Sequence, residues 1–225
     1  MGKLYVVSTP IGNLKDITLR ALEVLQSVNF IACEDTRRTL ILLNHYKIEG
    51  KKLLSYYEPK ESVQVPKILK LLEKEDVALV TDAGTPSISD PGYKLIRACI
   101  EKGIPVEVIP GPSAVICALV GSGLPTDRFT FVGFLPKKGL NNFLEELRRY
   151  KDSTIIAFES PNRLIKSLEA IKEVYGDNTT VCVARELTKV HEEYIRGRVV
   201  EVLDELNKRG EVKGEIVILW HLVED

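Results

Sequence analysis

The chain alternates short apolar runs with longer segments in which apolar residues recur at helical spacing. In its first half, the apolar runs predict strands at Lys3–Val7, Phe30–Cys33, Val77–Thr81 and Val106–Ile109. The periodic segments predict helices at Asp16–Val28, Thr36–Tyr46, Val63–Lys74, Gly92–Lys102 and from the N-cap residue Ser113 to about Val120. No element is predicted within Lys52–Glu61. This alternation predicts a largely parallel sheet with helices on its faces.

The second half continues with strands and helices in a less regular order. Strands are predicted at Phe129–Phe134, Thr154–Phe158, Thr180–Ala184, Tyr194–Val199 and Glu215–Leu222. Helices are predicted at Leu140–Tyr150, Arg163–Tyr175 and Val200–Lys208. We expect the last two strands to pair antiparallel, which makes this sheet mixed. A cluster of Gly121, Gly123 and Pro125 marks the boundary region, so we expect an α/β domain over residues 1–115 and a second over residues 116–225.

The composition and net charge exclude several classes of protein. The chain has 225 residues, 44% of them hydrophobic, and 31 Lys and Arg residues against 32 Asp and Glu residues give a net charge of -1. This balance is typical of a globular protein and excludes a disordered, collagen-like or membrane protein. A charge near zero argues against coating of nucleic acid by bulk electrostatics, but it leaves room for a local basic patch.

Cysteine and histidine usage bears on compartment and metals. The four cysteines are far apart in apolar segments without a CxxC pair, and the three histidines lack the spacing of metal ligands. The apolar run before Ser8 is too short for a signal peptide, and no run approaches the length of a membrane span. We therefore expect reduced core cysteines in a cytoplasmic protein, with no metal and no membrane contact.

Three loops of similar design follow strands in the first half: Thr9–Asn13, Asp82–Pro86 and Pro110–Ala114. The carboxyl ends of parallel strands lie at one edge of a sheet, where ligands bind. The glycines of these loops let backbone approach a ligand closely, although ordinary turns between strands and helices also favour glycine and proline. The chain contains no GxGxxG, no GxxxxGK[ST] and no GxSxG motif, which argues against a standard dinucleotide fold, a P-loop NTPase and an α/β hydrolase.

Two polar clusters follow strands in the second half, Glu159–Arg163 and Arg185–Glu193. Each is open to a structural interpretation, as a solvated loop with a helix cap. Alternatively, Arg185 and Lys189 hold a phosphate, and Glu186 or Lys189 accepts a proton. A carboxylate is ionised at neutral pH without help, whereas a lysine must first have its pKa lowered.

Paired basic residues supply local positive charge. The pair Arg37-Arg38 follows the second strand and is therefore expected at the same edge as the glycine loops. Such pairs are often no more than exposed helix faces. Grouped at one edge, however, they suffice to dock folded RNA by its phosphates.

The same segments resemble a known superfamily. The opening Leu4–Leu22, the segment Gly84–Ile88 and the segment Pro110–Ala114 resemble the tetrapyrrole methylases, the class III methyltransferases. Thr85 stands where that superfamily has Asp, which argues against a classical porphyrin substrate. Nearly the whole chain resembles the ribosomal small-subunit methyltransferase I family, through Ser8–Asn13, Glu34–Thr39, Asp82–Gly92, Phe158–Arg163 and Arg185–Glu193.

This resemblance implies a reaction and a set of ligands. It implies two α/β domains with S-adenosylmethionine in the cleft between them, a homodimer, and methylation of the ribose 2′-hydroxyl of a cytidine in the decoding region of 16S rRNA in the small ribosomal subunit. The residues implied for the cofactor are Pro10, Gly12, Gly84, Thr85, Ile88, Ser113, Ala114, Phe158, Ala184 and Gly214. We expect Arg185, Glu186 and Lys189 to take part in the chemistry, and the RNA to contact Arg37, Arg38, Asn162, Arg163 and His191.

Two alternatives remain open. The first is a methyltransferase of the same fold that acts on a small tetrapyrrole or corrin. The second is a non-catalytic module that binds S-adenosylmethionine, in which the cluster at Arg185–Glu193 is purely structural.

Overall fold

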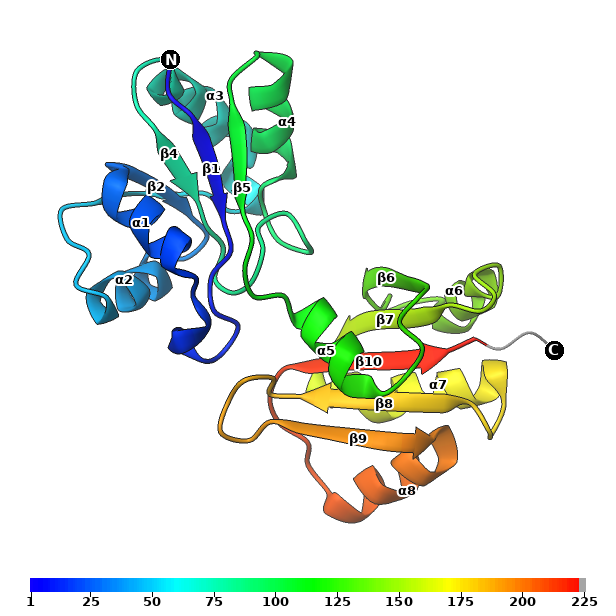
Figure 1. Cartoon of the computed structure of the whole chain (residues 1–225). Coiled ribbons are helices and arrows are strands. Elements are labelled where there is room, and N and C mark those ends of the chain that lie inside the picture. The colour runs from blue at the N-terminus through cyan, green and yellow to red at the C-terminus, as the bar shows by residue number, and fades with distance from the viewer. Residues whose placement is uncertain (223–225) are drawn as a thin grey trace. The chain divides into compact units, whose positions relative to one another are not determined.

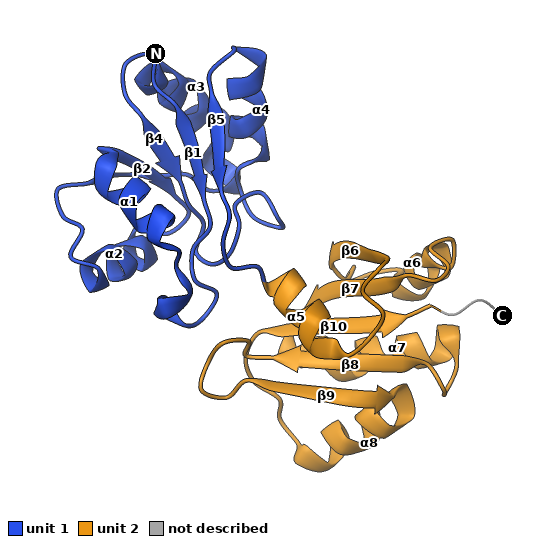
Figure 2. Ribbon diagram, viewed as in Figure 1, with its two compact units in different colours: residues 1–113 blue, residues 114–225 orange. Residues whose placement is uncertain are grey.

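The computed structural model describes residues 1–222 and shows two α/β units, Met1–Ser113 and Ala114–Asp225 (Figure 2). Each unit has its own sheet, its own helices and its own hydrophobic core, and each is described by itself below.

The sheet of unit 1 is entirely parallel, with strand order β3-β2-β4-β1-β5 (Figure 1). Its strands are β1 (Leu4–Val7), β2 (Phe30–Cys33), β3 (Lys52–Ser55), β4 (Val77–Leu79) and β5 (Val106–Ile109). Its helices are α1 (Leu19–Ser27), α2 (Thr36–His45), α3 (Glu61–Leu72) and α4 (Tyr93–Glu101), with short 3-10 turns η1 (Leu14–Asp16) and η2 (Glu58–Lys60). The parallel sheet expected from the sequence is confirmed.

Helices cover both faces of this sheet. Successive strand residues point to opposite faces, so Val7 packs with α1 and α2 while Val6 packs with α3 and α4. Both faces are apolar and buried, as is usual for parallel sheets. This three-layer arrangement leaves the loops at the carboxyl ends of the strands as the irregular part of the unit.

The edge strand β3 of unit 1 was not predicted. It lies within Lys52–Glu61, is only half-buried and pairs on one side, so its sequence lacks the apolar run of a central strand. The helix expected over Asp16–Val28 is confirmed as α1, which begins at Leu19 because the Thr18 side chain caps it by accepting a hydrogen bond from the Ala21 amide at 3.1 Å.

Unit 2 has a mixed sheet of order β6-β7-β10-β8-β9. Its strands are β6 (Phe129–Phe134), β7 (Thr154–Glu159), β8 (Thr180–Arg185), β9 (Glu193–Arg198) and β10 (Ile216–His221). Its helices are α5 (Ala114–Ser122), α6 (Leu140–Leu147), α7 (Leu164–Tyr175) and α8 (Val199–Arg209), with the 3-10 turn η3 (Pro161–Arg163). Only β6 and β7 pair in parallel, so the mixed character expected from the sequence is confirmed.

The expected pairing of the last two strands was wrong. Strand β10 lies between β7 and β8 and is antiparallel to both, while β9 pairs with β8 at the edge. The burial of the strands explains this order. Residues 216–220 of β10 are all buried and suit a central position, whereas β9 mixes buried Ile195 with exposed Arg196 and Arg198.

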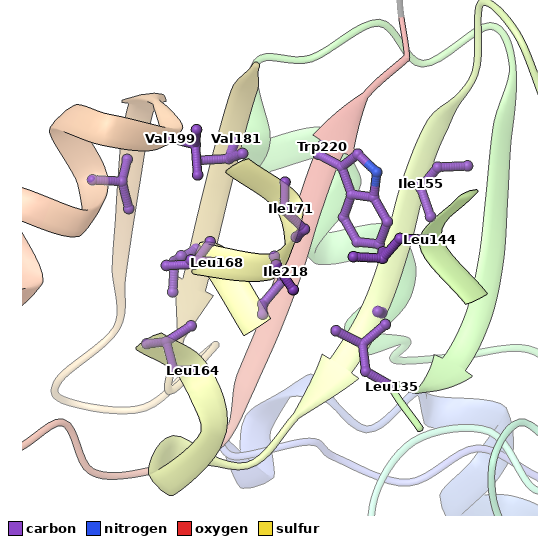
Figure 3. Close-up of a cluster of buried hydrophobic side chains, with 14 of the residues drawn as sticks. Leu135, Leu144, Ile155, Leu164, Leu168, Ile171, Val181, Val199, Ile218 and Trp220 are labelled. Atoms are coloured by element: carbon purple, nitrogen blue, oxygen red, sulfur yellow. The ribbon is translucent and has the colours of Figure 1, made fainter. Parts of the chain in front are cut away.

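The core of unit 2 lies between its sheet and the helices α6, α7 and α8. Figure 3 shows side chains from these helices and from the strands interlocking around Trp220 and Ile218, both of which are fully buried. The labelled members of this cluster are Leu135, Leu144, Ile155, Leu164, Leu168, Ile171, Val181, Val199, Ile218 and Trp220.

Helix α5 packs on the other face of this sheet, and its carboxyl end is held by strand β9. The Arg196 guanidinium donates to the carbonyl oxygens of Gly121 and Ser122, and the Tyr194 hydroxyl donates to the carbonyl of Cys117 at 3.1 Å. The Arg196 donors satisfy carbonyls that the end of the helix leaves unpaired. Helix α5, which begins at Ala114, is therefore anchored at its carboxyl end to β9, the strand that follows the 185–193 loop.

Within residues 1–222, no helix has the length and apolar character needed to cross a membrane. The cysteines at positions 33, 99, 117 and 182 are all free thiols, and the first two and the last are buried.

The contact between Gly121 and Tyr194 yields a stability prediction. A Cβ atom at position 121 would lie 2.3 Å from the Tyr194 ring, so Gly121→Ala should lower the free energy of unfolding by about 1–3 kcal/mol through overpacking. Chemical denaturation measures this change. The control is Val120→Ala on the same helix, at a position that is 73% exposed, and a similar loss in both variants would contradict the proposed clash.

Candidate functional site

The structure brings the three glycine loops of unit 1 together at the carboxyl edge of its sheet. Thr9 and Gly84 form a two-way main-chain bridge, with the Thr9 amide donating to Gly84 at 2.9 Å and the Gly84 amide donating to Thr9 at 3.0 Å. This bridge joins the loop after β1 to the loop after β4. Gly84 has a φ of 80°, a left-handed conformation that glycine adopts without strain.

Thr85 ties the third loop to the other two. Its hydroxyl lies 2.9 Å from the Ser8 hydroxyl and 3.3 Å from the carbonyl oxygen of Pro112, to which it donates. A Cβ atom on Gly111 would lie 3.0 Å from the Ser8 Cβ atom, so this close approach favours glycine. The three loops therefore form one connected surface, referred to below as the loop cluster.

The cofactor residues expected in unit 1 differ in exposure. Pro10 and Gly84 are buried, Thr85 and Ser113 are half-buried, and Gly12 and Ile88 are exposed. Ala114 is the first residue of α5 and is half-buried.

Carboxylates gather beside the loop cluster. The Asp35 amide donates to Asp82 at 3.0 Å, which connects the loops after β2 and β4. Burial, followed by the nearby charges of Glu34 and Asp82, raises the pKa of Asp90 to about 7. Burial and the charge of Asp82 also raise the pKa of Glu34. A carboxyl group with a pKa near neutrality is a frequent feature of functional sites.

A pocket of about 500 Å³ adjoins this region within unit 1. Its lining includes Glu34, Glu61 and Asp90, the rings of Tyr57 and Tyr93, and backbone of the loop between β4 and α4. Asp90 and Glu61 are functional candidates that the sequence alone does not reveal. Their contacts span distant parts of the chain, and no local pattern of residues indicates them.

Arg37 and Arg38 lie at the start of α2 and are largely exposed, with side chains 87% and 62% accessible. Arg37 pairs with Asp35 at 2.7 Å, and Arg38 approaches Asp82 at 3.4 Å. Both remain accessible to a ligand, although each already has an acidic partner.

In unit 2, Arg185 connects the polar loop to a neighbouring turn. Its guanidinium donates to Glu193 at 2.6 Å, to the carbonyl of His191 at 3.2 Å and to the carbonyl of Lys213 at 2.9 Å. With its side chain only 20% exposed, Arg185 braces the loop from inside.

Glu186 and Lys189 form an ion pair in the same loop, with Lys189 Nζ 2.9 Å from Glu186 Oε1. The Glu215 amide donates to the same oxygen at 2.8 Å. These two contacts lower the pKa of Glu186. Burial alone would lower the pKa of Lys189, but its hydrogen bonds to Glu186 and Glu215 raise it overall. At neutral pH, Glu186 is therefore ionised and Lys189 is protonated.

The backbone around Glu186 is strained. Glu186 has a φ of 51° and Thr188 a φ of 66°, values that residues other than glycine rarely adopt. A Cβ atom at Gly214 would lie 2.5 Å from the Glu186 side chain. Such strain persists only where the surrounding contacts enforce it, and it gathers at functional sites.

The remaining expected residues of unit 2 lie at strand ends. Arg163 donates to the carbonyls of Leu135 and Pro136, at 3.0 and 2.7 Å, and so holds the loop after β6. Phe158 packs against the rings of Phe131 and Phe134. Ala184 is buried within β8, while Asn162 and His191 are exposed.

The expected residues thus form local groups. Gly84 and Thr85 belong to the loop cluster, where Ser8 and Thr9 join them. In unit 2, the loop that carries Arg185, Glu186 and Lys189 contacts Gly214 in the turn before β10. The roles assigned to these residues, and the binding of the cofactor between the halves, stay predictions. No group of three His, Cys, Asp or Glu residues arranged to hold a metal ion occurs within residues 1–222.

Comparison with known sequences gives a family and close relatives. Residues 3–203 match the family described as Tetrapyrrole (Corrin/Porphyrin) Methylases. The chain is 62% identical to the Ribosomal RNA small subunit methyltransferase I of Hydrogenobaculum sp., over 96% of this chain and 94% of that protein. It is 48% identical to the protein of the same name from Thermotoga maritima, over 97% of this chain and 98% of the relative.

Solved structures show the same fold. Diphthine synthase aligns with a TM-score of 0.76 and 16% identity, over 98% of this chain and 90% of that chain. A uroporphyrin-III C-methyltransferase from Thermus thermophilus, in complex with S-adenosylhomocysteine, aligns with a TM-score of 0.66 and 18% identity, over 97% of each chain.

The raised pKa of Asp90 predicts a pH-dependent stability. Between an unfolded pKa of 3.8 and a folded pKa of about 7, the folded state binds the extra proton, so Asp90 makes the free energy of unfolding fall as pH rises through this interval. Asp90→Asn should therefore raise the melting temperature by a few degrees at pH 8 and by clearly less at pH 5, where only part of this interval has been crossed. The control is Asp204→Asn at an exposed position on α8, and an equal shift in both variants at both pH values would contradict this assignment.

Proposed function

The chain belongs to the ribosomal small-subunit methyltransferase I family, a branch of the tetrapyrrole methylases, and on that premise we propose that it transfers a methyl group from S-adenosylmethionine to the RNA of the small ribosomal subunit. The observation that carries the proposal is similarity along almost the whole chain, including the loops at the carboxyl edge of unit 1. We also propose that it acts in the cytoplasm, where ribosomal RNA is available as its substrate.

We assign the acceptor to the ribose 2′-hydroxyl of a cytidine in the decoding region of 16S rRNA. The support for this assignment is the resemblance of Glu34–Thr39 and Arg185–Glu193 to this branch of the superfamily. Thr85, in place of the superfamily's Asp, argues against a tetrapyrrole or corrin acceptor. The ionised Glu186 in its strained loop supplies a proton acceptor, which transfer requires and a module that only binds the cofactor does not.

The residues of the loop cluster fit S-adenosylmethionine. Gly84 and Gly111 present backbone with no side chain in the way, Ile11 adds an apolar surface, and Thr85 and Ser113 add small polar groups. The carboxylates of Glu34, Asp82 and Asp90 favour a positively charged ligand at the same edge. When bound, S-adenosylmethionine supplies a methyl group on a cationic sulfur atom that is already a good leaving group. We assign Pro10, Gly12, Ile88, Ala114, Phe158, Ala184 and Gly214 to the same ligand.

The protein must align the ribose oxygen and remove its proton as the new bond forms. Of the two candidate bases, only Glu186 is in the proton-accepting form, because the pKa of Lys189 is raised. Lys189 and the Glu215 amide both donate to Glu186 Oε1, so we assign proton acceptance to Oε2. Lys189 then orients the carboxylate, and Arg185 keeps the loop in place.

RNA binding requires locally grouped positive charge, because the net charge of the chain is -1. Arg37 and Arg38 are exposed at the carboxyl edge of unit 1, and we assign them to phosphate contacts together with Asn162, Arg163 and His191. We also propose a homodimer, since two copies present twice as many basic groups to the RNA.

The function is tested with small ribosomal subunits that lack their methyl groups. Incubation with the protein and methyl-labelled S-adenosylmethionine should place label in the RNA, and digestion to nucleosides should place it on the ribose of cytidine. Label on a base would overturn the assignment to ribose. Label in a tetrapyrrole but not in RNA would favour the first alternative, and binding of the cofactor without transfer would favour the second.

Variants of the ion pair test the catalytic assignment. Glu186→Gln should reduce transfer by 10²-fold or more, because the amide cannot accept the proton, and Lys189→Ala should also abolish most activity by releasing the carboxylate. Both should bind S-adenosylmethionine normally by calorimetry. Glu169→Gln, an exposed position on α7, is the control, and wild-type turnover in both loop variants would refute the assignment.

A further inference from the structure

Glu61, the first residue of α3, carries a carboxylate that is almost completely buried, with its side chain 6% exposed. It accepts hydrogen bonds from the Tyr56 hydroxyl at 3.0 Å and from the Gly92 amide at 3.2 Å, and Lys94 Nζ lies 2.9 Å away. Burial opposes ionisation, but donation from Lys94, Tyr56 and Gly92 outweighs it and lowers the pKa of Glu61. The group is therefore a buried carboxylate that stays charged.

A charged group in this position needs an explanation. Removal of a carboxylate from water is unfavourable, and apolar residues of similar volume often stabilise a fold as well or better. The other buried positions of α3, Ile68 and Leu72, are apolar. Glu61 differs from them because its carboxylate accepts a hydrogen bond from the main-chain amide of Gly92.

Gly92 ends the loop that begins at Gly84 and carries Thr85 and Ile88. The first end of this loop is fixed by the bridge between Gly84 and Thr9. At the far end, Gly92 has a φ of 145°, and a Cβ atom there would lie 3.2 Å from both Leu79 Cδ2 and the Ser87 amide nitrogen. The hydrogen bond from the Gly92 amide to Glu61 thus fixes the second end of the loop, as the bridge between Gly84 and Thr9 fixes the first.

The middle of the loop is not a relaxed conformation. Ser87 has a φ of 74° and Ser89 a φ of 60°, both in the left-handed region that is unfavourable for serine. The Ser87 amide donates to the carbonyl of Pro91 at 3.2 Å, which folds the loop back on itself. A strained loop of this kind keeps one shape only if both of its ends are held.

We propose that Glu61 is a positioning residue for methyl transfer: held by the Tyr56 hydroxyl, it accepts from the Gly92 amide, fixes the far end of the 84–92 loop and thereby sets the placement of Thr85 and Ile88 against the cofactor. This inference rests on the proposed function. Lys94, whose side chain is 59% exposed, compensates the charge of the buried Glu61 carboxylate through an ion pair at 2.9 Å.

The experiment separates positioning from stability. Glu61→Leu replaces the carboxylate by an apolar group of similar size that should keep the core packed but cannot accept a hydrogen bond. Glu61→Gln keeps an oxygen that can accept from the Gly92 amide, and Lys94→Met removes only the ion pair. For each variant and the wild type, melting temperature, the dissociation constant for S-adenosylmethionine and kcat are measured well below the melting temperature, together with amide exchange in residues 84–92.

We expect Glu61→Leu to weaken S-adenosylmethionine binding roughly 10-fold to 100-fold and to speed exchange across the loop, since a loop that is no longer held must be ordered each time the ligand binds. Glu61→Gln should restore binding to within about 3-fold of wild type. Lys94→Met should lower the melting temperature, because it leaves a buried carboxylate without its cation, but it should change binding by less than about 3-fold, because the Gly92 amide keeps its acceptor. Wild-type affinity and slow exchange in a folded Glu61→Leu protein would overturn the proposal. So would losses of affinity that follow melting temperature alone across the three variants.

Failure of the proposed function and failure of the Glu61 role give different results. If the wild-type protein neither binds S-adenosylmethionine nor methylates RNA, the proposed function fails, whatever the variants do. If the wild type is active and Glu61→Leu behaves like it, only the role of Glu61 fails. Should Glu61→Leu not fold, Tyr56→Phe and Glu61→Gln provide the same comparison, because a positioning network predicts faster loop exchange when the Tyr56 donor is lost.

Discussion

Two main-chain hydrogen bonds between Thr9 and Gly84 connect segments that leave the parallel strands β1 and β4. Parallel strands have no turn between them, so the loops at their ends meet only if something beyond the sheet joins them. Here the bridge does so, and Thr85 extends it to Ser8 and Pro112. The arrangement of the loop cluster, of the acidic residues beside it and of the folded 84–92 loop depends on these two hydrogen bonds. Without it, three flexible loops would have to be ordered again each time a ligand bound.

Much of this architecture is predictable from local pattern. The parallel sheet of unit 1 follows from buried runs alternating with helical segments, and the glycine loops from their positions after those runs. The order of strands in unit 2 is not local: β10 takes a central place because all of residues 216–220 are apolar and buried, although β9 precedes it in the chain. The edge strand β3 was missed for the opposite reason, since a half-buried strand carries little apolar signal.

The candidate site, like the fold, is predictable from local sequence only in part. Glycine, proline and grouped polar residues at strand ends identify the loops, but they say nothing of partners. Arg185 looks in sequence like a phosphate ligand, whereas its guanidinium braces its own loop through Glu193, His191 and Lys213. Lys189 looks like a possible base, whereas two carboxylates keep it protonated. Glu61 gives no local signal, because its contact to Gly92 spans 31 positions of the chain. Charge states and long-range partners are properties of the folded molecule.

The contact between Glu186 and Gly214 restricts how this loop can vary through evolution. A Cβ atom at position 214 would lie 2.5 Å from the nearest Glu186 atoms, which is closer than any packing contact although longer than a covalent bond. A side chain there would therefore force the Glu186 carboxylate to move, and would disturb its contact to Lys189 at 2.9 Å. Position 214, 28 residues from Glu186 in the chain, is thus constrained by the carboxylate that it faces.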